Sequence, residues 1–115
     1  MNSPQRGEIW LVRFPFTDLT STKVRPALVI AVHGSDVIVL GLFSRVPPVP
    51  LKNIWLLISD NDPTFPPSGL KKTSLLRAEK IAVIHESVFH SRLGRLTDRW
   101  ITQADQALKH ALQLS

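Results

Sequence analysis

The stretch Gly7 to Ile30, GEIWLVRFPFTDLTSTKVRPALVI, decides the fold of this chain of 115 residues. Its first part, Glu8 to Phe14, has the β-branched and aromatic content of a strand. Pro15 ends that strand, because proline cannot donate to a sheet ladder. After a polar loop, Arg25 opens a near-continuous apolar run, Pro26 to Val32, that is typical of a buried strand. The stretch therefore predicts two strands, with a cation held at the start of the second.

The remaining chain predicts further strands and one helix. A tight turn joins Pro26–Val32 to a second apolar run, Val37–Phe43, so the two runs form a hairpin. Ile54–Ser59 and Ser74–Ile84 are also strands, and Arg92–Leu96 is a short strand or a turn. From Thr97 the spacing becomes helical, with Thr97 or Asp98 as N-cap and one apolar stripe: Trp100, Ile101, Ala104, Ala107, Leu108, Ala111 and Leu112.

We therefore expect one domain, 1–115, with four or five strands and a C-terminal helix. Several short strands joined by turns favour a small, strongly bent sheet or barrel that is covered on one side by the helix. The fold class is mainly β.

The composition of the chain favours some classes of function and excludes others. The net charge is +5 and the pI is about 10.3, which favours an anionic partner, either nucleic acid or an acidic protein. The absence of cysteine excludes disulfides, thiolate zinc sites and cysteine nucleophiles. The polar start, residues 1–6, lacks the apolar core of a secretory signal, and the longest apolar run is too short to span a bilayer. We expect a cytoplasmic protein with no membrane partner.

Polar residues that interrupt apolar strands are the candidates for chemistry. Arg25 begins one strand and Ser44 follows the end of another, while Arg77 and Glu79 are two residues apart and so share one face of a strand. Together they suit cleavage of a phosphodiester in RNA. Arginine would stabilise charge on phosphate oxygens, a carboxylate or hydroxyl would assist proton transfer, and the 2′-hydroxyl of RNA is itself the nucleophile, so no metal is needed. The alternative for Arg77 and Glu79 is an ordinary ion pair.

The aromatic residues and histidines are weaker candidates. Phe14 and Phe16 flank a proline, where they are harder to bury and can line a groove for a partner. The tryptophans could stack on bases, although packing is the default for each of them, and Trp100 falls on the apolar stripe of the helix. The histidines lack the spacing of a metal site, and we expect neither a metal nor another cofactor.

Motifs along nearly the whole chain resemble the MazF/PemK/Kid family of toxin ribonucleases. The matching pieces, in order, are Arg6–Trp10, Phe14–Asp18 (FPFTD), Arg25–Ile30 (RPALVI), Phe43-Ser44, Gly69–Ile81 (GLKKTSLLRAEKI) and Leu93–Thr97 (LGRLT). The likeness is strongest to the subgroup with a Pro-Phe-Thr-Asp loop.

The resemblance implies a small SH3-like β-barrel with a C-terminal helix, usually a homodimer. It also implies a metal-independent, ribosome-independent endoribonuclease that cuts single-stranded RNA at selected sequences and leaves 2′,3′-cyclic phosphate and 5′-hydroxyl ends. A cognate antitoxin would neutralise it with an acidic, partly disordered tail.

Residue by residue, the resemblance assigns catalytic roles to Arg25, Ser44, Arg77 and Glu79. Many relatives carry threonine at the position of Ser44 and some carry aspartate at that of Glu79, so both functional groups are kept. RNA would be contacted by the loops 14–23 and 45–53, through the candidate residues Phe14, Phe16, Thr17, Lys23 and Arg45.

Two other functions stay open. Related barrels poison DNA gyrase through a protein contact, so the fold alone does not determine the function. The chain could also bind RNA and an antitoxin while cutting poorly.

Overall fold

The computed structural model describes residues 3–13, 24–48 and 50–114. Within these ranges it contains six strands, two short 3-10 helices and one α-helix: β1 (Glu8–Arg13), β2 (Val24–His33), β3 (Asp36–Phe43), β4 (Trp55–Ile58), η1 (Pro66–Ser68), β5 (Ser74–His85), η2 (Glu86–Val88), β6 (Phe89–Arg95) and α1 (Asp98–Ala111). Four of the candidate RNA contacts, Phe14, Phe16, Thr17 and Lys23, lie outside the described residues.

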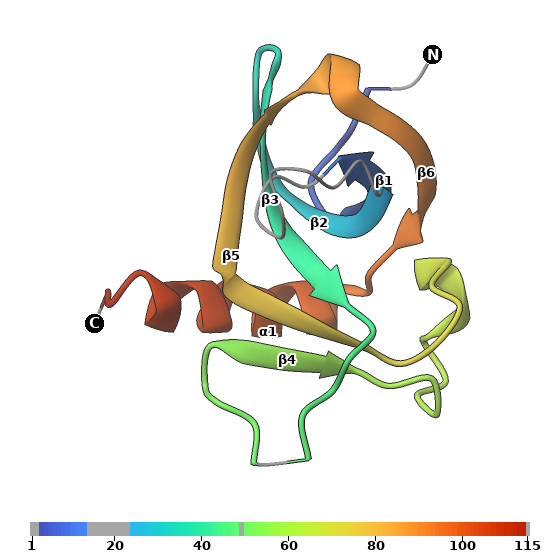
Figure 1. The fold of residues 1–115 in the computed structure, drawn as a ribbon, viewed down its shortest axis with the longest axis vertical. Coiled ribbons are helices and arrows are strands. Elements are labelled where there is room, and N and C mark those ends of the chain that lie inside the picture. The colour runs from blue at the N-terminus through green and yellow to red at the C-terminus, as the bar shows by residue number, and fades with distance from the viewer. Residues whose placement is uncertain (1–2, 14–23, 49, 115) are drawn as a thin grey trace.

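The strands form one antiparallel sheet in the order β4-β5-β3-β2-β1-β6. The sheet curls strongly on itself, and α1 lies across its open lower side (Figure 1). The mainly β fold with a C-terminal helix is therefore confirmed. The sheet is not fully closed as a barrel, because β4 and β6 remain its two edges.

A sharp bend in β5 shapes the lower half of the molecule (Figure 1). On β3, the neighbours Leu40 and Gly41 pair with Ile81 and Arg77 of β5, which are four positions apart. The intervening residues of β5, Ala78–Lys80, have no counterpart on β3, and extra residues of this kind bend a strand and redirect its side chains. Before the bend β5 also pairs with β4, so Arg77 lies opposite Trp55.

Two buried clusters hold the sheet and helix together. The larger one lies between the sheet and α1, and includes Leu28, Leu40, Leu76, Trp100 and Ala104. The smaller one lies within the curl of the sheet and includes Trp10, Val12, Val37, Val39 and Ile84. Burial of apolar side chains at about 25 cal/mol per Å² is the main stabilising term in both clusters.

The segment around η1 packs backbone to backbone against β6. Gly69 has a φ of +73°, and a Cβ there would lie 1.9 Å from the carbonyl oxygen of Leu93. A Cβ at Gly94 would lie 2.1 Å from the carbonyl oxygen of Pro67. Only glycine allows this close approach, which fixes the segment leading into β5.

One detail of the sequence prediction was wrong. We expected four or five strands, but the structure has six in its described part, because most of the segment Arg92–Leu96 belongs to the longer strand β6, which ends at Arg95. Thr97 does occupy the N-cap position of α1, but its side chain makes no capping hydrogen bond. Its Oγ1 is buried and has no hydrogen-bond partner among the described residues.

No helix in the described ranges is long and apolar enough to span a membrane.

Candidate functional site

Two adjoining clefts open on the sheet, and Arg25 lines both of them. The first, which we name the arginine cleft, has a volume of about 570 Å³ and is lined by Arg25, Phe43, Arg45, Pro47, Leu75, Arg77 and Lys80. The second, the lysine cleft, has a volume of about 300 Å³. Its polar lining residues are Arg25, Ser44, Lys71, Lys72 and Ser74, and its apolar ones include Leu11, Pro26, Leu42, Leu70 and Leu93.

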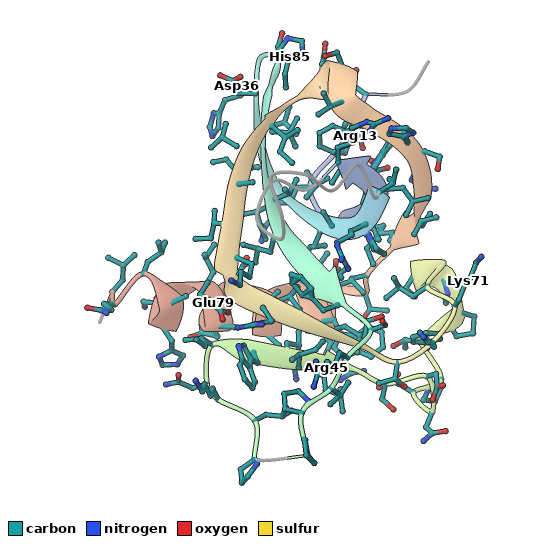
Figure 2. All side chains as sticks on the ribbon, viewed as in Figure 1. Arg13, Asp36, Arg45, Lys71, Glu79 and His85 are labelled. Carbon is teal, nitrogen blue, oxygen red and sulfur yellow. The ribbon has the colours of Figure 1, made fainter. Side chains whose placement is uncertain are left out.

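The fold brings these side chains together from distant parts of the chain. Arg25 is the second residue of β2, and Ser44 and Arg45 directly follow β3. Lys71 lies between η1 and β5, while Glu79 lies at the bend of β5 (Figure 2). The β5 bend and the glycine packing at η1 thus set the relative positions of the basic residues.

The lining of the two clefts is cationic. It contains six basic side chains: Arg25, Arg45, Lys71, Lys72, Arg77 and Lys80. No aspartate or glutamate is among the described residues that line either cleft. Of the six, only Arg77 has an ion-pair partner within the described residues. A surface of this kind attracts a polyanion.

Arg25 carries a donor that is unpaired among the described residues. Its Nε is buried, yet it has no hydrogen-bond partner among the described residues. A buried donor without a partner costs about 1–3 kcal/mol, so a bound anion that accepts from it would gain stability. The guanidinium group is suited to bidentate binding of phosphate oxygens.

Arg77 is held firmly by its neighbours. Its Nε and Nη2 both donate to Oε2 of Glu79, at 3.1 and 2.7 Å. Its guanidinium carbon lies 5.2 Å from the centre of the Trp55 ring and 5.8 Å from that of Phe43. Both distances are in the range of cation–π contacts, so the arginine is fixed by an ion pair and by aromatic rings.

Both carboxylate oxygens of Glu79 accept hydrogen bonds. Besides the two bonds from Arg77, its Oε1 and Oε2 lie 3.2 and 3.3 Å from the indole Nε1 of Trp55, which donates to both. Partial burial raises the pKa of Glu79, but the hydrogen bonds from Arg77 and Trp55 outweigh that effect and the pKa is lowered overall. The group is therefore a carboxylate at neutral pH.

The structure brings some predicted residues together and separates others. Arg25, Arg45 and Arg77 share the arginine cleft, whereas Ser44 lines only the lysine cleft, which it shares with Arg25. Glu79 lines neither cleft and reaches them only through Arg77.

Sequence reasoning missed four residues near the clefts: Lys71, Lys72, Lys80 and Trp55. The three lysines are ordinary surface residues by sequence. For Trp55, packing was the default expectation and stacking on bases the alternative, and neither pointed to a contact with Glu79. The indole contact could have been found only from the pairing of β4 with β5.

The histidines stay outside the clefts. His85 is exposed, and its Nδ1 accepts a hydrogen bond from the backbone N–H of Ser87 at 3.1 Å. In the described part of the chain, no group of three or more His, Asp or Glu side chains is arranged to hold a metal ion.

Comparison with known proteins decides the family. The family of PemK-like, MazF-like toxins of type II toxin–antitoxin systems matches residues 5–112. The chain belongs to this family. The resemblance carried by the sequence motifs is thereby confirmed. No curated protein sequence matches the chain significantly.

Several solved structures share the fold. An endoribonuclease from a mycobacterial species has 23% identity and a TM-score of 0.71, covering 99% of this chain and 95% of its own. A mycobacterial endoribonuclease in complex with its cognate antitoxin has 19% identity and a TM-score of 0.74, with 98% of both chains covered. MazF in a MazE–MazF structure from Deinococcus radiodurans has 14% identity and a TM-score of 0.72 over 100% of both chains. At these identities, the likeness shows that the PemK/MazF-family chain has their fold.

Proposed function

We propose that this chain is the endoribonuclease toxin of a toxin–antitoxin pair and that it cleaves single-stranded RNA in the paired clefts. The observation that carries the proposal is the arrangement of six basic side chains around Arg25, with no acidic residue among the described lining. Membership of the family and the endoribonucleases among the structural neighbours support the choice of RNA.

The proposed reaction needs no external nucleophile. The 2′-oxygen of a ribose bonds to the adjacent phosphorus and loses its proton, while the bond from phosphorus to the 5′-oxygen breaks and that oxygen gains a proton. The products are a 2′,3′-cyclic phosphate and a 5′-hydroxyl. Negative charge grows on the non-bridging oxygens in the transition state, and fixed cations stabilise it.

Arg25 and Arg77 are the cations proposed for this role. Both line the arginine cleft, and the Nε of Arg25 has no partner among the described residues. A fixed donor to transition-state charge contributes about 10²–10³-fold in rate. Ser44, beside Arg25 in the lysine cleft, is proposed to assist proton transfer.

The same clefts suit an antitoxin. A relative of this chain was solved with its cognate antitoxin, and the cationic lining would accept an acidic protein segment as it would accept RNA. We propose that such a segment competes with RNA for the paired clefts and thereby neutralises the toxin.

The test is to incubate the purified, antitoxin-free protein with a long single-stranded RNA in EDTA and to map the ends of the fragments. We expect discrete cuts with 5′-hydroxyl ends, and a loss of at least about 100-fold in rate for Arg25→Ala. Lys109→Ala is the control, because this exposed lysine of α1 lies outside both clefts.

Two results would count against the proposal. Full activity of a folded Arg25→Ala protein would remove Arg25 from the site. A well-folded wild-type protein that leaves RNA intact, but inhibits DNA supercoiling by gyrase, would favour the protein-binding function.

A further inference from the structure

Trp55 and Glu79 form one connected unit with Arg77 at the bend of β5. The indole N–H of Trp55 donates to both carboxylate oxygens of Glu79, and Oε2 of the same carboxylate accepts two bonds from Arg77. The side chains of Arg77 and Glu79 are 34% and 29% exposed, so the unit is partly shielded from water.

The unit leaves the outer donors of Arg77 available. A guanidinium carries five N–H donors, and the bonds to Glu79 use the Nε–H and one N–H of Nη2. The remaining three can serve a phosphate in the arginine cleft, which Arg77 lines and Glu79 does not. The ion pair and the rings of Trp55 and Phe43 set the direction in which those donors point.

The carboxylate of Glu79 is poorly placed to take a proton from RNA. Both of its oxygens already accept hydrogen bonds, and the residue is absent from the lining of both clefts. The same bonds lower its pKa, which weakens it as a base.

We propose that Glu79 and Trp55 are positioning residues that orient Arg77 toward the scissile phosphate, and that Glu79 is not the general base. This inference rests on the proposed ribonuclease function. Trp55 thereby has a role in the reaction although it need not touch the RNA, and Glu79 acts through Arg77.

Two substitutions of Glu79 separate the roles. Glu79→Gln keeps an oxygen that accepts from Arg77 and Trp55, whereas Glu79→Ala removes it. For a positioning residue we expect Glu79→Gln to keep kcat within about tenfold of wild type and Glu79→Ala to lose at least tenfold more. A general base contributes about 10²–10⁴-fold, so equal losses of that size in both variants would overturn the inference.

The Arg77→Ala background gives a second readout. If Glu79 acts only through Arg77, adding Glu79→Ala to Arg77→Ala lowers kcat no further, because the two changes remove the same function. A further loss of about 100-fold in the double variant would show an independent role for Glu79 and would overturn the inference.

Trp55→Phe should change kcat in opposite directions for a positioning residue and for a general base. It keeps an aromatic ring beside Arg77 but removes the N–H that donates to Glu79. A positioning role predicts a fall in kcat of about three- to tenfold. A general base would be strengthened by the loss of that donor, so an unchanged or higher kcat in Trp55→Phe would overturn the inference.

A measurement without RNA distinguishes this inference from the proposed function. In ¹⁵N spectra of the folded protein, Glu79→Ala should shift both the Nε–H of Arg77 and the Nε1–H of Trp55, but not the indole signal of buried Trp100. If wild-type protein does not cut RNA while both signals shift, the proposed function fails and the network stands. If neither signal shifts, the network itself is refuted.

Discussion

Lys71 and Lys72 provide a quantitative test of RNA binding that does not require cleavage. Both line the lysine cleft beside Arg25, and neither is in an ion pair with a described residue. Each lysine that contacts a phosphate releases a counterion when RNA binds. The binding constant of single-stranded nucleic acid then falls with salt by a logarithmic slope of about −0.7 per contact.

The structure sets the size of the effect. Five basic residues in the clefts have no ion-pair partner among the described residues: Arg25, Arg45, Lys71, Lys72 and Lys80. If each meets a phosphate, the slope is about −3.5, and affinity falls about 100-fold between about 50 and about 200 mM salt. Lys72→Ala should reduce the slope to about −2.8, and Lys71→Ala/Lys72→Ala to about −2.1.

Fluorescence anisotropy with a labelled 2′-O-methyl RNA measures this slope, because the blocked 2′-oxygen prevents cleavage. Lys109→Ala removes the same charge from α1 and should leave the slope unchanged. A slope near zero in the wild type, or an equal change for Lys72→Ala and Lys109→Ala, would show that the clefts do not bind the RNA backbone.

Two further predictions concern stability. Trp100 is 2% exposed in the larger core, so Trp100→Ala should lower the free energy of unfolding by about 3–5 kcal/mol in urea denaturation. Val83 is 64% exposed, so Val83→Ala should lower the free energy of unfolding by less than about 0.5 kcal/mol. Comparable losses for Trp100→Ala and Val83→Ala would refute this assignment of the core. Burial raises the pKa of Glu8, but hydrogen bonds, led by that from Trp10, lower it overall. Glu8 therefore stabilises the fold above its unfolded pKa and loses this effect as the pH falls through its lowered folded pKa. Thermal melts of Glu8→Gln should show a weaker loss of stability at acid pH, and an unchanged pH dependence would contradict it.

Most of the sheet could be predicted from the sequence, because its strands are dense in apolar and β-branched residues. The run Pro26–Val32 lies within β2, and Ser74–Ile84 lies within β5, with bounds that differ by at most two residues at either end. β6 was underestimated, since His90 and Ser91 are exposed and polar and give no apolar pattern.

The site was only partly predictable. Arg25 and Arg77 stand out because they interrupt apolar strands, and both line the arginine cleft. The bend of β5 could not be predicted, since Glu79 and Lys80 interrupt the apolar pattern without showing where the strand bends. Without the bend, the environment of Glu79 could not be inferred. The contacts of loop 14–23 with RNA, the catalytic roles and the homodimer stay predictions.

The course of β5 also bears on how the protein opens. Leu76 and Ala78 belong to the larger core and Ala82 and Ile84 to the smaller one, so this single strand takes part in both. Segments that unfold locally are those with few buried contacts, such as edges of sheets. The amides of Leu75–Arg77, where β5 pairs with both β3 and β4, should therefore exchange their hydrogens only when the whole domain unfolds, later than those of the edge strand β6. Arg77 thus belongs to the part of the molecule that unfolds last. Its orientation is therefore kept when the edges of the sheet unfold locally.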